Sequence, residues 1–145
     1  MRIFYVAIMA VMMCSLNACA DNDQIITFEQ LPAAAQQTVK ANFNVETVSY
    51  VLLDRELFGN EYEVRLTDGS ELKFKSDGVL KKVDCKFQAV PEALVPEIVR
   101  QQVKAQFPQA FIVEWGEEDG GWKAELNNKL ELRFNRRYDF IGVDD

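Results

Sequence analysis

The amino-acid sequence predicts an α+β fold made of two tandem repeats, each a helix followed by a four-stranded antiparallel sheet. Three observations predict it. The chain resembles itself at an offset of about 60 residues, each copy opens with apolar residues at helical spacing, and each continues with apolar and charged residues in alternation. We assign residues 27–88 to the first repeat and residues 89–145 to the second. Each repeat is near the lower size limit for independent folding, so we expect the two to pack together.

The composition is that of a packed globular protein with an acidic balance. Among 145 residues, 48% are hydrophobic, and 16 Lys and Arg face 23 Asp and Glu, which gives a formal net charge of −7. An acidic chain binds phosphate backbones poorly, so we expect no nucleic-acid partner. The chain also has no His, the side chain best suited to proton transfer near neutral pH and a common metal ligand. We therefore expect a protein that is not an enzyme and that has no cofactor.

The amino terminus has the pattern of a signal peptide. A positive charge at Arg2 precedes an apolar run, residues 3–13, that is shorter than the roughly 20 residues of a membrane span. The segment Leu16-Asn17-Ala18-Cys19 then resembles the bacterial lipobox. This resemblance implies a signal peptide over residues 1–18, followed by a lipidated Cys19 and a tether over residues 19–26.

The lipobox pattern implies an exported protein of the cell envelope. Ala20 follows the cysteine, and a residue other than aspartate at that place resembles the pattern for outer-membrane sorting. We therefore expect an outer-membrane lipoprotein that faces the periplasm or the cell surface and contacts the membrane through its lipid anchor only. Ordinary secretion, with cleavage after Ala18 or Ala20 and no lipid, is the alternative.

A helix is expected at the start of each repeat. Thr27 and Gln30 have the spacing of a capping box, which predicts a helix start in the first repeat. Pro32 and Pro96 each suit a first helical turn, where the missing N–H breaks no hydrogen bond. The helical stripes comprise Leu31, Ala35, Val39 and Phe43 in the first repeat and Leu94, Val95, Ile98, Val99, Val103 and Phe107 in the second.

Strands follow each helix, and the alternation predicts how they pair. A three-residue loop at residues 67–69 sets Val64 opposite Leu72 and Tyr62 opposite Phe74, so the apolar side chains share one face. A two-residue turn would mix the faces. We therefore expect Gly69 to adopt the left-handed conformation in a bulged loop. The second repeat gives the equivalent pairs, Ala124 with Leu132 and Trp122 with Phe134.

The strand segments also carry a family pattern. YEVRLTDGSELKFKSDGVLKKVD (residues 62–84) contains aromatic-Glu-Val-x-Leu, a glycine turn and x-Phe-x-x-Asp-Gly, and residues 122–144 repeat it with Lys129 and Tyr138 in place of the turn glycines. With a Pro-led helix before each copy, residues 28–144 resemble the PepSY-like family of secreted bacterial domains with a β-lactamase-inhibitor-protein-like fold. The resemblance implies a non-catalytic module that binds an envelope protein and inhibits an envelope enzyme or protease.

The candidate partner-binding residues are of two kinds. Lys73 and Arg133 lie on the charged face of the predicted sheet, which is a candidate docking surface. Phe58, Trp115 and Tyr138 lie in or beside predicted loops or less regular strands, where large aromatic side chains often anchor partner proteins.

The acidic run Glu117-Glu118-Asp119 supports an alternative function. Followed by two glycines, these carboxylates are candidate ligands for a hard cation such as Ca²⁺, and would make the protein a lipoprotein that binds or senses Ca²⁺ or a small ligand. The run lacks the ordered Asp-x-Asp-x-Asp-Gly spacing of a calcium loop. We therefore favour a solvated hairpin loop and assign no metal site.

Overall fold

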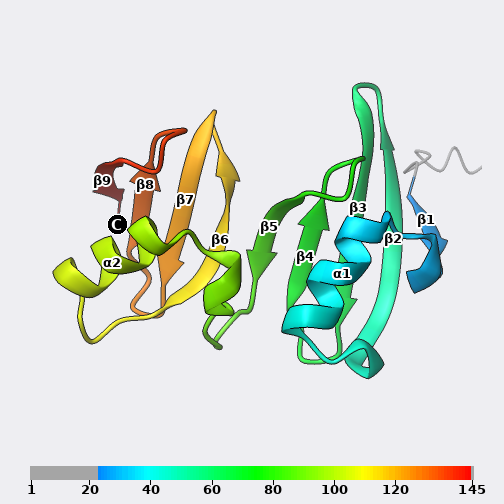
Figure 1. The fold of residues 1–145 in the computed structure, drawn as a ribbon, viewed down its shortest axis with the longest axis horizontal. Coiled ribbons are helices and arrows are strands. Elements are labelled where there is room, and N and C mark those ends of the chain that lie inside the picture. Colours follow the sequence, from blue (N-terminus) through cyan, green and yellow to red (C-terminus); the bar gives the residue numbers. More distant parts are fainter. Residues whose placement is uncertain (1–22, 145) are drawn as a thin grey trace, which may run out of the picture.

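Residues 23–144 form one continuous antiparallel sheet with two α-helices on one of its faces (Figure 1). The structure is a computed structural model that describes residues 23–144. The predicted signal peptide and the predicted lipid site at Cys19 lie outside the described residues. Within the described residues, no helix has the length and apolar character needed to cross a membrane.

The helices occur where the apolar spacing predicts them. They are α1 (Ala33–Asn42) and α2 (Glu97–Gln106), and Pro32 and Pro96 lie at their N-caps. The capping box instead closes a separate 3₁₀ turn at Phe28–Gln30, in which the Thr27 N–H donates to Gln30 Oε1 over 2.8 Å. Short 3₁₀ turns also occur at Val45–Thr47 and Glu92–Leu94. The buried helical side chains are Ala35 and Val39 of α1 and Val99 and Val103 of α2.

Nine strands of residues 23–144 pair in chain order, each with the next. The strands are β1 (Gln24–Ile26), β2 (Val48–Glu56), β3 (Gly59–Leu66), β4 (Glu71–Phe74), β5 (Leu80–Asp84), β6 (Ile112–Glu118), β7 (Gly121–Leu126), β8 (Glu131–Phe134) and β9 (Phe140–Asp144).

The predicted fold class is therefore wrong, because the chain does not form two repeats that each have their own four-stranded sheet. β5 pairs with β6 and sets Val83 opposite Trp115, which joins all the strands into one sheet. Residues 24–26, assigned above to the tether, form β1 beside β2. The physical reason is the cost of a bare strand edge, where backbone N–H and C=O groups lack partners. Pairing β5 with β6 covers two such edges at once.

The predicted pairing within the hairpins is confirmed. Val64 pairs with Leu72 and Tyr62 with Phe74, while Gly69 has a φ of +90°. In the second hairpin Ala124 pairs with Leu132, and Lys129 takes a φ of +75° at the place of the glycine. Lys129 thus adopts the same left-handed turn, at the steric cost that a Cβ brings there.

A bulge in the first half explains why Val83 does not follow the alternation. Phe74 pairs with Leu80 and Lys73 with Lys82, so Lys81 is the extra residue. The bulge shifts the alternation by one position, which places Val83 beside Leu72 on the buried face.

Both helices pack on the same face of the sheet, over one shared core (Figure 1). Val39 and Val99 from the two helices belong to a single buried cluster with Phe74 and Phe134 from the sheet. Neither helix covers the opposite face of the sheet (Figure 1). We call that opposite surface the open face.

Candidate docking surface

The open face carries charged side chains in two parallel rows. Directly paired residues project to the same side of a sheet, so the strand registers define which side chains line up. One row is mainly cationic and contains Glu63, Lys73, Lys82, Gly116, Lys123 and Arg133. The neighbouring row is mainly anionic and contains Arg65, Glu71, Asp84, Glu114, Glu125, Glu131 and Asp144. The rows therefore place opposite charges side by side.

Lys123 is the centre of the ion-pair network. Its Nζ lies 3.2 Å from Glu118 Oε1, 3.3 Å from Glu131 Oε1 and 3.7 Å from Glu114 Oε1, and its side chain is only 14% exposed. Burial favours the neutral amine, but the hydrogen bonds to Glu118 and Glu131 and the charge of Glu114 outweigh it. The pKa of Lys123 is therefore raised above its ordinary value.

Gly116 makes room for a lysine at the join between β5 and β6. A Cβ on Gly116 would lie 2.9 Å from Lys82 Cγ and 3.0 Å from Lys82 Cβ, closer than packed carbons tolerate. Lys82 thus lies across the glycine, and its Nζ is 3.0 Å from Glu114 Oε1. Glu114 forms ion pairs with Lys82 from the first half of the chain and with Lys123 from the second.

A second ion-pair cluster lies on β3 and β4. Arg65 Nη2 is 2.6 Å from Glu71 Oε2 and 2.9 Å from Glu63 Oε1. The hydrogen bond to Glu63 and the charge of Glu71 outweigh burial and raise the pKa of Arg65. Lys73 extends this cluster, with its Nζ 3.4 Å from Glu71 Oε1, and remains 39% exposed. Lys73 is therefore the more exposed of the two cations in this cluster.

The candidate residues of the charged face lie where the sequence places them. Lys73 and Arg133 both project from the open face, and Arg133 is the more exposed at 52%. Arg133 Nε is 3.0 Å from Asp144 Oδ2 on β9, a pair in which both side chains remain about half exposed. Both cations are accessible to a docking protein.

Two of the three aromatic candidates are not exposed anchors. Trp115 is 3% exposed within β6 and stacks on Trp122, with ring centroids 5.1 Å apart and planes 5° apart. The assignment of Trp115 to a partner-binding surface is therefore wrong, because its side of β6 faces the core. Tyr138 packs partly buried against both tryptophans, at 6.2 Å and 5.5 Å. Phe58, in contrast, is fully exposed at the turn between β2 and β3.

The acidic run at the turn between β6 and β7 does not converge on a cation site. Glu117 Oε1 pairs with Lys75, and Glu118 Oε1 pairs with Lys123. Asp119 has a φ of +49° in the turn. No group of three or more Cys, Asp or Glu side chains within residues 23–144 is arranged to hold a metal ion. Two of the three carboxylates are thus already paired with the ammonium groups of lysines, which lie where a bound cation would have to lie.

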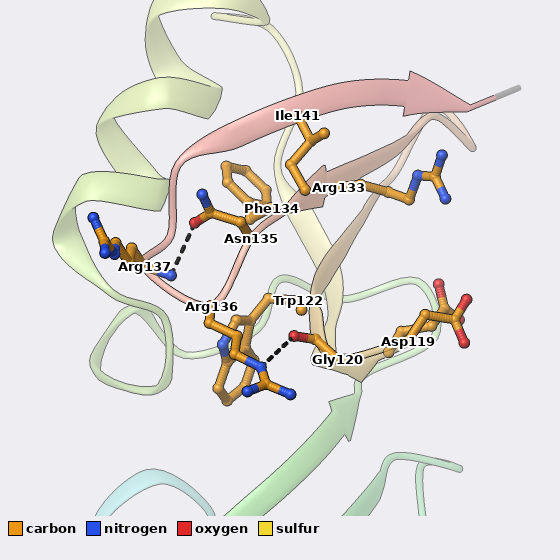
Figure 2. A pocket seen from close by; sticks show the side chains of 11 residues that line it. Asp119, Gly120, Trp122, Arg133, Phe134, Asn135, Arg136, Arg137 and Ile141 are labelled. Atoms are coloured by element: carbon orange, nitrogen blue, oxygen red, sulfur yellow. Dashed lines mark hydrogen bonds between the residues drawn. The ribbon is translucent and has the colours of Figure 1, made fainter.

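A pocket of about 490 Å³ lies beside the same turn, between residues 118–122 and 133–137 (Figure 2). Arg136 Nε donates a hydrogen bond of 2.9 Å to the Gly120 carbonyl oxygen and so holds the two hairpins together. Figure 2 shows the guanidinium groups of Arg133 and Arg137 pointing in different directions. Because these charged groups diverge, the pocket does not offer the convergent polar groups that define a small-ligand site.

The sequence reasoning missed Lys82 and Glu114, the two residues that link the halves of the open face. Their positions become neighbours only when β5 pairs with β6. It also missed Leu57, which is 97% exposed beside Phe58. The local signal for Leu57 was the pair of apolar residues before Gly59, in a segment that the second repeat lacks.

The fold and the surface define the class of this protein: an α+β sheet scaffold with one bare, charged face. The chain belongs to the PepSY-like family, because the family model described as "Putative beta-lactamase-inhibitor-like, PepSY-like" matches residues 19–82 and 60–142. No curated protein matches the chain. The family description names no enzymatic activity.

Solved structures from Bacteroides share the fold. A "putative periplasmic protein from DUF2874 family" of Bacteroides vulgatus is 30% identical with a TM-score of 0.82, and the match covers 87% of this chain and 99% of that chain. A "putative calcium-regulated periplasmic protein" of Bacteroides thetaiotaomicron is 29% identical with a TM-score of 0.81 and the same coverages. A second Bacteroides vulgatus protein, described as periplasmic and of unknown function, is 29% identical with a TM-score of 0.78, covering 85% and 99%.

Proposed function

We propose that this protein is an exported, envelope-anchored binding module that docks another envelope protein on its open face. The observation that carries the proposal is the bare face itself, on which Lys73 and Arg133 stay 39% and 52% exposed although each pairs with a carboxylate. A surface of mixed charge steers and orients a charged partner more than it supplies affinity. The descriptions of the similar structures as periplasmic support an exported location.

The finer assignments belong to the same proposal. The lipobox pattern at Cys19 supports a lipid anchor, with the module facing the periplasm or the cell surface. The inhibitor-like description of the family supports a partner that is an enzyme or protease whose active site the open face covers. Binding without catalysis is consistent with a chain that has no His.

A calcium- or ligand-sensing lipoprotein is the second candidate function. The description of one similar structure as calcium-regulated favours it. In this chain, the pairing of Glu117 and Glu118 with lysines weighs against it. We therefore rank docking on the open face first.

The experiment that tests the proposal is capture of a partner from envelope extract, followed by a binding measurement with the purified partner. The variant Lys73→Glu/Arg133→Glu reverses both exposed cations, and Lys104→Glu on the helical side of the fold is the matched control. We expect the double reversal to abolish capture and the control to retain it. Affinity should also fall as salt is raised, because exposed charges are screened. Capture that survives the double reversal would contradict the proposal.

A further inference from the structure

The turn between β2 and β3 presents two adjacent apolar side chains to solvent. Leu57 is 97% exposed and Phe58 is 101% exposed, so neither contributes to the core. This hairpin projects beyond the ends of the neighbouring strands (Figure 1). Its strands have nine and eight residues, whereas the equivalent β6 and β7 have seven and six. The first half of the chain thus carries an extension that ends in an apolar tip.

Neither the turn nor the fold requires these side chains. Leu57 and Phe58 keep negative φ angles, while Gly59 takes the positive one at +132°. A turn whose two central residues both keep negative φ accepts most residue types, so its geometry does not select an apolar pair. The corresponding turn of the second half has another conformation, because Asp119 and Gly120 both take positive φ, at +49° and +76°. Leu57 and Phe58 therefore form an exposed apolar surface that is available for contact with a partner.

The charges beside the tip indicate whether its binding partner is a membrane or a protein. Asp54 and Glu56 lie on the open-face side of β2 and form no ion pair within residues 23–144, although the charge of Glu56 interacts with that of Lys81, which pairs with Glu61. Arg55 carries the opposite charge and hydrogen-bonds to Gln24 Oε1 over 3.0 Å. The three carboxylates beside the tip, Asp54, Glu56 and Glu61, outnumber its two cations, and anionic lipid headgroups repel such an excess in a chain whose net charge is already −7. These carboxylates are attracted by a protein pocket bordered by Lys or Arg.

We propose that the Leu57–Phe58 tip is an anchor that inserts into an apolar pocket, bordered by cationic side chains, on the envelope protein that this module binds. The inference rests on the proposed function and deepens it by naming the chemistry of the partner. Large side chains that fill a partner pocket supply much of the energy of many interfaces. The tip lies at one end of the sheet, so it contacts a different part of the partner from the charged rows of the open face.

The test places a photo-crosslinking benzoylphenylalanine at position 58 of the full chain in the bacterium that encodes it. Position 98 on α2 is the control, because Ile98 is also exposed, at 53%. The protein crosslinked at position 58 is then purified and its Kd for the wild-type chain is measured. We expect Leu57→Ser and Phe58→Ser each to weaken binding by roughly 10- to 100-fold. Glu56→Lys should also weaken it, and Asp119→Lys in the equivalent turn should not.

Each other outcome overturns the proposal. A crosslink to lipid, together with Phe58-dependent binding to vesicles of phosphatidylethanolamine and phosphatidylglycerol, would show a membrane contact. A crosslink to a second copy of this chain would show self-association, and the absence of any product at position 58 would show that the tip is unoccupied. A partner that needs Lys73 and Arg133 but not Phe58 would overturn the tip anchor and leave the proposed function standing. Melting curves of the serine variants, expected to match the wild type, verify folding.

Discussion

Glu114 Oε1 forms an ion pair with Lys82 Nζ, 3.0 Å away, across the pairing of β5 with β6, and this contact connects the two halves of the chain on the open face. The Glu114 side chain is only 11% exposed and lies near Lys123 as well. A carboxylate held between two lysines satisfies both cations in a partly buried setting. The join between the halves is therefore electrostatic on one face and apolar, through Val83 and Trp115, on the other.

Removing the charge of Glu114 should weaken this join. Glu114→Gln leaves Lys82 and Lys123 facing each other without their shared carboxylate, so we expect a loss of about 1–3 kcal/mol in the free energy of unfolding. Urea denaturation measures it. Glu125→Gln is the control, because its partner Lys129 is 73% exposed and such pairs contribute little. Equal stability of the two variants would contradict the central role of Glu114.

Truncating Trp115 should destabilise the core rather than a partner interface. Trp115→Ala removes a 3% exposed ring that stacks on Trp122, and we expect a loss of about 3–5 kcal/mol. Phe58→Ala, at a fully exposed position, should change stability by less than about 0.5 kcal/mol. Thermal or urea unfolding of the two variants compares them. Wild-type stability of Trp115→Ala would show that the ring is not packed as described.

Two glycines of the sheet offer a matched test of close packing. A Cβ at Gly116 would meet Lys82 at 2.9 Å, whereas a Cβ at Gly142 would meet nothing within 4 Å. We expect Gly116→Ala to destabilise the protein by about 1–3 kcal/mol through overpacking and Gly142→Ala to be close to neutral. Urea unfolding again provides the measurement. If both variants behave alike, the approach of Lys82 to Gly116 is looser than these distances indicate.

Acid should remove the contribution that ionised Asp84 makes to the free energy of unfolding. Burial alone would raise its pKa, but hydrogen bonds from the Lys86 side chain and backbone N–H outweigh burial and lower it. A carboxylate with a lowered folded pKa stabilises the fold above the unfolded value of about 3.9, and this stability is lost as pH falls through the folded pKa. We therefore expect a smaller acid dependence of unfolding in Asp84→Asn, measured between pH 7 and pH 3. If the stability of the wild type and of Asp84→Asn depended on pH in the same way, Asp84 would not make this contribution.

Calcium should leave the melting temperature unchanged at millimolar concentration. Two of the three carboxylates in the acidic run are held by Lys75 and Lys123, and a ligand raises the melting temperature only by binding the folded state. Differential scanning calorimetry with Ca²⁺, and with Mg²⁺ as the control, tests this. A rise with Ca²⁺ that disappears in Glu118→Gln/Asp119→Asn would favour the sensing function instead.

Local pattern was enough to predict both helices and the pairing inside each hairpin. The spacing of Val39 and Val103 indicated buried helical faces, and the length of the loop ending at Gly69 determined which residues pair. These features depend on residues close together in the chain. Lys73 and Arg133 were assigned to the charged face for the same reason, since alternation alone places them there.

Three features came from long-range pairing: the strands form one sheet, residues 24–26 add a strand to it, and Trp115 is buried. Each outcome depends on pairing between segments far apart in sequence. A bulge between Ile112 and Glu114 also breaks the alternation that would have marked Trp115 as a core residue. Each hairpin could be predicted from its own residues, because a hairpin satisfies its own inner hydrogen bonds. It left undetermined which outer edges meet, because edge pairing depends on the chain as a whole.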